Sequence, residues 1–126
     1  MVIEINTLKT SPIYEQLRDQ VVLGIAGKKL ASGEALPSVR RLAADLGINL
    51  HTVNKAYAML SEEGYIAMDR HKGAYVTQAP AGGGPYAAAL AGKLTLAAAE
   101  AVCHNMIEND FISLCKECYK SAVGGS

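Results

Sequence analysis

Three polar residues, His51, Asn54 and Lys55, recur at helical spacing in a stretch whose apolar residues lie on another side. At about 100° per residue, they project together from one flank of a helix. An imidazole and an amide can donate and accept hydrogen bonds, and an ammonium adds positive charge, so this group suits a polar, anionic partner. A second basic run, RHK at residues 70–72, follows in the sequence. Each group alone would also fit a solvated surface.

The three cysteines invite a metal or redox interpretation. Cys115 and Cys118 are three residues apart and Cys103 precedes His104, so three cysteines and one histidine are present, and both residue types bind zinc. Cys115 and Cys118 also fall on an apolar stripe, where cysteine behaves as a small hydrophobic residue. We therefore favour a structural role and expect no bound metal, with a thiol- or metal-responsive regulator as the alternative. An odd cysteine count without framework spacing fits a reducing compartment.

The sequence contains no recognisable catalytic site. It has no glycine-rich phosphate loop, no paired carboxylates in a plausible pocket and no supported Ser/His/Asp set. We expect neither enzyme activity nor a cofactor. The 126 residues include 12 Lys/Arg and 12 Asp/Glu, so bulk charge indicates no partner, and the 50% hydrophobic content favours a folded chain.

Neither a membrane span nor a leader is expected. The apolar stretches fall short of the ~18–20 uninterrupted residues of a membrane helix, because Lys93 interrupts the alanine-rich region. The N-terminus, MVIEINTLKTSP, lacks a basic region followed by an apolar run. The sequence therefore predicts a soluble, cytoplasmic protein without a membrane partner.

Two short helices joined by a tight turn must position the polar group. Ser38 follows a proline as an N-cap, Gly47 suits a left-handed C-terminal position, and Asn49 can cap the next helix. The earlier helix carries the apolar stripe Val39, Leu42, Ala43 and Leu46. The later helix runs from about Leu50 to Glu63, with the stripe Val53, Ala56, Tyr57 and Leu60.

Further elements surround this pair. A first helix is expected with Ser11 as N-cap and Pro12 as its first residue, burying Ile13, Leu17, Val21 and Ile25. The runs YIAMDR and AYVT flank HKG and predict a hairpin with Gly73 near its bend. QAPAGGGP, residues 78–85, has the composition of a linker. An alanine-rich helix then runs from Tyr86 to about Asn109, where Asn109-Asp110 begins a short final helix that ends in a frayed GGS.

The predicted fold is mostly α with a small β-hairpin wing. It comprises a winged helix-turn-helix at residues 1–77, the linker at 78–85 and a two-helix tail at 86–126. A helix–tight turn–helix presents its second helix to the major groove of DNA. His51 and Asn54 would then reach base edges, Lys55 and Arg40 would contact phosphates, and the basic run would form the wing tip.

Residues 11–76 closely resemble the DNA-binding domain of GntR-type bacterial transcription regulators. The resemblance rests on LPSVRRLA, on LG in the turn, on TVNKAY with its following leucine and glycine, and on the glycine in the wing. The form IN..TVNKAY, with a short tail, is most similar to the YtrA subgroup. This resemblance implies a sequence-specific regulator, expected to be a repressor. A winged helix used as a protein-interaction module is the alternative.

The resemblance also implies which side chains contact DNA. Arg40 matches the arginine of the second helix that reaches the operator, and Thr52 matches a phosphate contact. Many family members have arginine where this chain has Leu50 and Asn54, so adenine recognition by Asn54 replaces guanine readout. Resemblance and spacing together give the predicted DNA-binding residues Ser38, Arg40, Leu50, His51, Thr52, Asn54, Lys55, Arg70, His71, Lys72 and Gly73.

The tail is expected to form a homodimer. Two helices cannot enclose a sizeable ligand pocket, so a metabolite-binding domain is not expected. Their apolar stripes predict an interface made by Leu90, Leu94, Ala97, Ala101, Phe111, Leu114 and Tyr119. Residues 1–78 carry nine basic and eight acidic residues, so one module gains little from counterion release. Linking two modules on a near-palindromic operator would supply the missing affinity.

Overall fold

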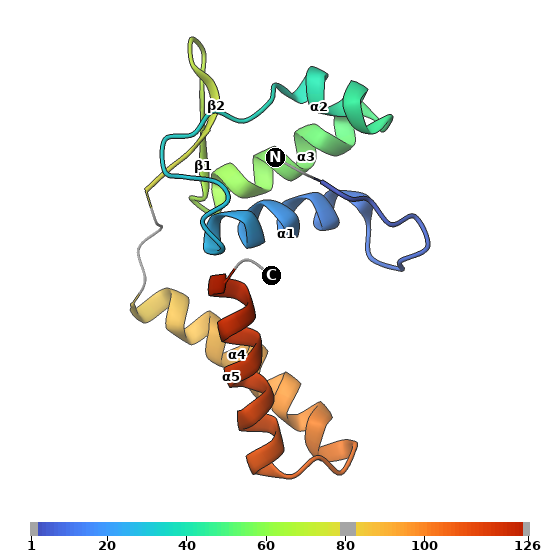
Figure 1. The fold of residues 1–126 in the computed structure, drawn as a ribbon, viewed down its shortest axis with the longest axis vertical. Helices are drawn as coiled ribbons and strands as arrows, with labels where there is room; N and C mark the ends of the chain where they lie inside the picture. Colours follow the sequence, from blue (N-terminus) through green and yellow to red (C-terminus); the bar gives the residue numbers. More distant parts are fainter. Residues whose placement is uncertain (1–2, 79–82, 125–126) are drawn as a thin grey trace. The chain divides into compact units, whose positions relative to one another are not determined.

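The computed structural model describes residues 3–78 and 83–124, which form five helices and two strands (Figure 1). The chain divides into two compact units, Met1–Pro80 and Ala81–Gly124. The first unit contains α1 Ile13–Ala26, α2 Val39–Leu46, α3 Leu50–Glu62, β1 Ile66–Asp69 and β2 Gly73–Val76. The second contains α4 Gly84–Cys103 and α5 Glu108–Gly124. The expected mostly helical fold with one small hairpin is confirmed.

The first helix starts one residue later than predicted. Pro12 is its N-cap rather than its first helical residue, with φ −58° and ψ 150°, and no side chain caps the helix. The carbonyl of Pro12 accepts the amides of Glu15 at 3.1 Å and Gln16 at 3.2 Å. The extended ψ angle explains the difference, because it places Pro12 outside the helix while its carbonyl still accepts the first bonds.

The helix–turn–helix follows the predicted capping pattern. Ser38 accepts the amide of Arg41 through its hydroxyl at 3.1 Å. Gly47 adopts φ 65°, a left-handed conformation that favours glycine, and closes α2. Asn49 accepts the amide of His51 at 2.7 Å and so begins α3 only two residues after that glycine. The last helical residue of α3 is Glu62, one residue before the expected end.

The core of the first unit lies where α1 and α2 pack against α3. Val53, Ala56 and Leu60 of α3 are fully buried, as the stripe predicted. They contact one hydrophobic cluster that also includes Leu17, Val21, Leu30, Leu36, Leu42, Ala43, Tyr57, Ile66, Ala74 and Val76. Because both flanking helices bury their stripes against α3, the opposite flank of α3 is left exposed.

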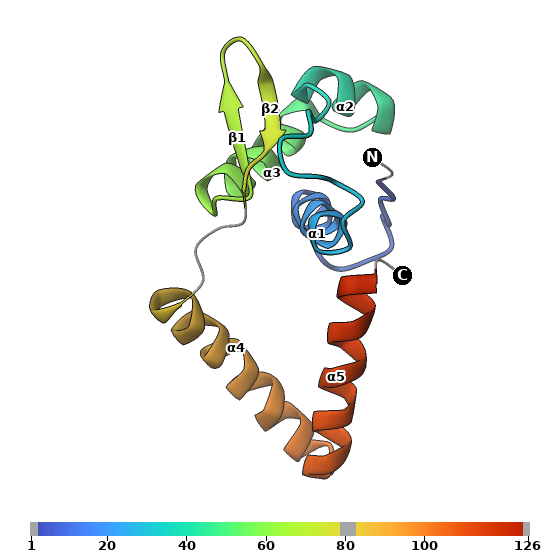
Figure 2. The same ribbon diagram turned by 60° about the vertical axis from the view of Figure 1, so that its left-hand side comes forward.

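The hairpin is fixed to the segment that precedes α2. β1 and β2 form the antiparallel hairpin that Figure 2 shows. Their register runs from Ile66↔Val76 to Asp69↔Gly73. On the other side of β2, Leu36 donates to the carbonyl of Ala74 at 2.9 Å. The amide of Gly33 donates to the carbonyl of Val76 at 2.7 Å, and the amide of Val76 donates back to Glu34. These bonds hold the hairpin at a defined position beside α2.

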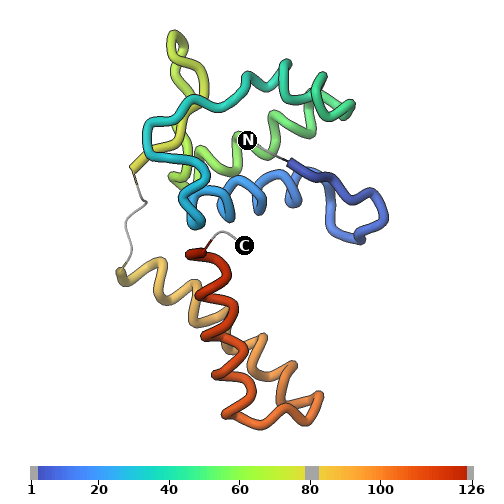
Figure 3. The backbone as a smooth tube through the Cα atoms, in the orientation of Figure 1, coloured from blue at the N-terminus to red at the C-terminus, as the bar shows by residue number. Residues whose placement is uncertain are grey.

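The N-terminal segment doubles back before α1, as the tube in Figure 3 shows. Two glutamines one turn apart on α1 bind its backbone. The side-chain amide of Gln16 accepts the amide of Asn6 at 2.9 Å and donates to the carbonyl of the same residue at 3.0 Å. Gln20 pairs in the same way with Glu4. Gln16 is buried with its polar atoms satisfied, which explains how a polar residue is tolerated beside the core.

The second unit corrects one predicted boundary. The alanine-rich helix was expected to reach about Asn109, but α4 ends at Cys103 with His104 as its C-cap. Asn105 adopts φ 62°, a left-handed conformation that asparagine tolerates, and turns the chain. The expected break at Asn109-Asp110 therefore lies inside α5. In Figure 2 the two helices diverge from this turn, and neither contains a buried residue within the part described.

The structure of this region bears on two further expectations, the linker and the absence of a membrane span. The linker was expected at residues 78–85, but α4 begins at Gly84, so the last two of these residues are helical. Residues 79–82, half of the expected linker, lie outside the described residues, as do 125–126 of the expected frayed end. By length and composition, α4 could cross a membrane, because it has 20 residues and a mean hydropathy of 1.3. The expectation from the sequence concerned uninterrupted apolar residues, and Lys93 does interrupt this helix. The same length and hydropathy also occur in helices that pack against other protein, so they do not establish a span.

Candidate nucleic-acid interface

The exposed flank of α3 presents His51 and Asn54. Asn49 binds the backbone amide of His51, which fixes the start of the helix and leaves the imidazole free. Both side chains are exposed, and neither has a hydrogen-bond partner within the residues that the structure describes. Their donors and acceptors are therefore available to a partner approaching α3.

Leu50 and Thr52 occupy the same turn but are less accessible. Both are half-buried, and Leu50 packs against the hydrophobic core. The amide of Thr52 donates to the carbonyl of Asn49 at 3.1 Å. These two residues therefore help to hold the first turn of α3 in place. Their predicted contacts with DNA stay predictions.

Helix α2 offers one unpaired guanidinium. Arg41 lies 3.8 Å from Asp45, whereas Arg40 is exposed and has no ion pair within the described part of the chain. The Ser38 hydroxyl oxygen is engaged as the cap of α2, but its hydrogen can still be donated. The first turn of α2 can thus supply a cation and a hydroxyl donor to a phosphate group.

Lys55 has a partner that its sequence position does not reveal. Its ammonium nitrogen lies 4.0 Å from the centroid of the Tyr14 ring, on the first turn of α1. This distance is well within the range of a cation–π interaction. Lys55 is nevertheless exposed, so the side of the ammonium that faces away from the ring remains accessible. Pattern analysis missed Tyr14, because helical periodicity carries no information on contacts between different helices.

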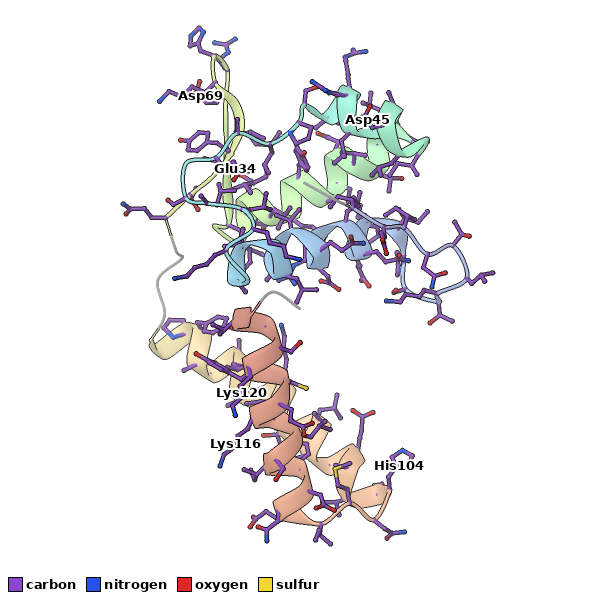
Figure 4. The ribbon with its side chains drawn as sticks, in the orientation of Figure 1. Glu34, Asp45, Asp69, His104, Lys116 and Lys120 are labelled. Carbon is purple, nitrogen blue, oxygen red and sulfur yellow. The ribbon has the colours of Figure 1, made fainter. Side chains whose placement is uncertain are left out.

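The tip of the hairpin is organised by Asp69, which Figure 4 labels beside the bend. Its carboxylate accepts the backbone amides of His71 at 2.7 Å and Lys72 at 3.0 Å. These two bonds, with a contribution from the charge of Lys72, lower the pKa of Asp69. Gly73 closes the turn with φ 74°. An aspartate that begins a turn ending in glycine is a recognisable sequence signal that could have identified Asp69.

The basic side chains at the hairpin tip have no hydrogen-bond partner among the described residues. Arg70, His71 and Lys72 are exposed, and their side chains form no hydrogen bond among the residues described here. The two bonds to Asp69 fix the backbone and leave the cationic groups pointing outward. The arrangement suits contact with a phosphate backbone.

Two interactions hold this face together from behind. The buried Tyr57 hydroxyl donates to the carbonyl of Pro37 at 2.7 Å, which ties α3 to the entry of α2, and burial raises the pKa of Tyr57 to about 12. At the other end, the Nε of Arg18 donates to Glu63 at 3.1 Å. The hydrogen bond to Glu63 raises the pKa of the Arg18 guanidinium. Both interactions fix the position of α3 relative to its neighbours.

The predicted residues thus form three groups on one unit. The first turn of α2, the exposed flank of α3 and the hairpin tip carry them, and α2 and the hairpin lie on the same side of α3 in Figures 1 and 2. The structure adds the contact of Tyr14 with Lys55, the bond from Tyr57 to Pro37 and the turn bonds of Asp69. The contacts of the individual side chains with DNA stay predictions.

These features are those of a winged helix-turn-helix protein of the GntR type. Residues 10–76 match the family of bacterial regulatory proteins called the gntR family. The match covers more than half of the sequence, so the chain belongs to the GntR family. The family resemblance and the winged-helix fold predicted from the sequence are confirmed. The family consists of regulatory proteins, which confirms the expectation that the chain is not an enzyme.

Individual relatives place the chain near the YtrA group. The chain is 38% identical over 76 residues to the transcriptional repressor YtrA of Bacillus subtilis. This alignment covers 60% of this chain and 58% of that protein. The chain is 35% identical to YtrA from Sulfolobus acidocaldarius, with a TM-score of 0.67 over 79% of this chain and 99% of that chain. A transcriptional antiterminator from Listeria monocytogenes EGD-e is 27% identical, with a TM-score of 0.91 over 100% of this chain and 96% of that one. The chain thus aligns with little more than half the length of the curated relatives it matches.

The tail cysteines are not covered within a single chain. Cys103, Cys115 and Cys118 are all free and exposed, and the structural role favoured for them stays a prediction. Within the described residues, no group of three or more His, Cys, Asp or Glu side chains could hold a metal ion. Burial of Cys115 and Cys118 within this chain is therefore not observed, and a second chain would have to provide it.

Proposed function

We propose that this chain is a sequence-specific DNA-binding transcription regulator that acts as a homodimer on a near-palindromic operator in the cytoplasm. The observation that carries the proposal is the exposed polar flank of α3, where His51 and Asn54 have no side-chain partner among the described residues, together with a basic hairpin tip in a chain of the GntR family. A relative in Bacillus subtilis is named a repressor, so repression is the proposed direction of control. Two structural relatives are likewise described as transcriptional proteins.

The proposed division of labour follows from the chemistry of the side chains. His51 and Asn54 read base edges in the major groove, and the amide of Asn54 matches the donor and acceptor of adenine. Arg40, Lys55 and Lys72 neutralise phosphates, which fixes the register of the protein without reading sequence. Residues 1–77 form the DNA-binding domain in this proposal, and residues 86–126 form the dimerisation tail.

The tail supports the homodimer because neither α4 nor α5 has a buried residue among those described. Leu94 is 47% exposed and Leu114 is 46% exposed, although both belong to the predicted apolar stripes. A contiguous apolar surface of this kind marks an interaction site. A second copy of the chain offers the same stripes, and the alanines of α4 allow close approach between helices. Two linked winged helices then bind one DNA molecule with far greater affinity than a single one.

A salt titration tests the DNA-binding part of the proposal. The affinity for duplex DNA should fall steeply with salt, with a log–log slope of about −0.9 for each phosphate that is neutralised. A protein-interaction module would show no such dependence for DNA. Comparable weak binding to all duplexes, with a slope near zero, would contradict the proposal. Equal affinity with and without reductant, and after chelation, would remove the thiol or metal sensor.

Sedimentation tests the homodimer with a matched pair of variants. Leu94→Glu places a charge on the apolar stripe and should convert the dimer to a monomer. Lys120→Glu is the control, because residue 120 is nine positions after Phe111 and therefore lies on the opposite side of α5 from the stripe. A chain that sediments as a monomer without any substitution, or a Leu94→Glu variant that remains dimeric, would contradict the proposed interface.

A further inference from the structure

The contact between Lys55 and Tyr14 joins the candidate DNA surface to a helix outside the helix–turn–helix. Lys55 lies one turn after His51 on α3, so both side chains belong to the same exposed flank. Its ammonium nitrogen is 4.0 Å from the Tyr14 ring centroid. The ring is half-buried and packs against the core, so its position is fixed. The flexible Lys55 side chain therefore lies against the fixed Tyr14 ring at the edge of the exposed flank of α3.

We propose that Tyr14 is a positioning residue for DNA binding, which holds the Lys55 ammonium in place for a phosphate of the DNA backbone. This inference rests on the proposed function and deepens it. The ring occupies one side of the ammonium, while the exposed side keeps its N–H donors for a phosphate oxygen. A lysine side chain that is already held loses less conformational freedom when it binds.

The contact does not serve mainly to hold α1 against α3. Leu17 and Val21 are both 1% exposed in the core, so they anchor α1 independently of Tyr14. The ion pair of Arg18 with Glu63 adds a second link at the far end of α3. Removal of the Tyr14 ring therefore leaves α1 attached and changes what Lys55 rests on.

A double-mutant cycle tests the inference. Tyr14→Leu removes the ring, Lys55→Met removes the charge, and Tyr14→Phe is the control that keeps the ring and removes the hydroxyl. Affinity is measured by fluorescence anisotropy on a labelled duplex that the wild-type chain selects from a random pool. Tyr14→Leu should weaken binding by about two- to five-fold, as expected for one exposed cation–π contact. The same substitution in the Lys55→Met background should have no effect, and Tyr14→Phe should bind as the wild type does.

The salt dependence separates positioning from a loss of charge. Tyr14→Leu keeps the lysine, so its log–log slope should equal that of the wild type. Lys55→Met should reduce the slope by about 0.9, because one phosphate contact is lost. A purely structural tyrosine would weaken binding equally in both backgrounds.

A measurement without DNA examines the contact itself. In the wild type and in Tyr14→Phe, NMR should show the ε-methylene protons of Lys55 shifted upfield by the ring, and Tyr14→Leu should remove the shift. An unshifted Lys55 in the wild type overturns the inference. Equal losses in both backgrounds, or tighter binding by Tyr14→Leu, also overturn it while the proposed function stands. A wild-type chain that binds no duplex overturns the proposed function and this inference together.

Discussion

The hydroxyl of Tyr57 offers a direct test of how α3 is held against α2. Tyr57→Phe removes the 2.7 Å hydrogen bond to the carbonyl of Pro37 and changes nothing else in shape. Tyr57 is 1% exposed, but Pro37 is only half-buried, so water can reach the carbonyl that loses its donor. An ordinary hydrogen bond contributes about 0.5–1.5 kcal/mol. We therefore expect the free energy of unfolding to fall by about 0.5–1.5 kcal/mol.

Thermal unfolding followed by circular dichroism measures this loss. In a unit of this size, 1 kcal/mol lowers the melting temperature by roughly 4–8 °C, so the variant should melt roughly 2–12 °C below the wild type. Tyr75→Phe is the control, because Tyr75 is half-buried and its hydroxyl has no partner among the described residues. If both variants melted together, the hydrogen bond to Pro37 would not be what fixes the entry of α2.

The pH dependence of the same difference provides a second check. Burial raises the pKa of Tyr57 to about 12, above its ordinary value of about 10. Since the folded state favours the neutral phenol, the stabilisation is fully present below pH about 10 and is lost as the pH rises to about 12. The advantage of the wild type over Tyr57→Phe should shrink across this interval. A constant difference would contradict the burial of the phenol.

Four further predictions concern the hairpin tip, the DNA-binding side chains and the tail. Asp69→Ala should weaken binding to duplex DNA, because the hairpin tip loses its two backbone hydrogen bonds. Asp69→Asn keeps an acceptor and removes a negative charge, so this variant should bind duplex DNA more tightly. Both effects are measured in the same anisotropy assay. Since the pKa of Asp69 is lowered in the folded chain, the order of the tip should persist above pH about 4 and decline below it, as chemical shifts of the tip amides can show. His51→Ala or Asn54→Ala should cost about 1–3 kcal/mol of operator affinity and spare non-specific binding, while Lys72→Ala should weaken all DNA alike. Deletion of residues 79–126 should leave a folded monomer with little operator affinity, as sedimentation and anisotropy would report.

The sequence predicted most of the fold because local rules decide it. Ser38, Gly47 and Asn49 act as caps within their own neighbourhoods, and each was identified from residue type alone. The apolar stripes of α2 and α3 likewise reflect a fixed helical period. The predicted end of α4 was wrong because two asparagines, Asn105 and Asn109, could each have ended the helix. Asn105 takes the left-handed conformation, while Asn109 continues into α5.

The polar residues of the candidate site could be predicted from the sequence, whereas the residues that contact and position them were harder to predict. His51, Asn54 and the basic tip stand out because they have no apolar role within their elements. Tyr14 and the carbonyl of Pro37 depend on which helices meet, and a single sequence carries no direct signal for such contacts. The exposure of Cys115 was also not predictable from the sequence, because an apolar stripe does not show whether the same chain covers it.

Selection of duplexes from a random pool by the wild-type chain tests the central claim most directly. Sequence-specific recognition by a homodimer predicts enrichment of one near-palindrome whose half-site centres lie about 10–10.5 bp apart, or a multiple of that distance. Exchange of Asn54 for alanine should relax the enriched motif at the base it reads. A pool that remains random after repeated rounds, at salt low enough for the chain to bind DNA, would contradict recognition by α3.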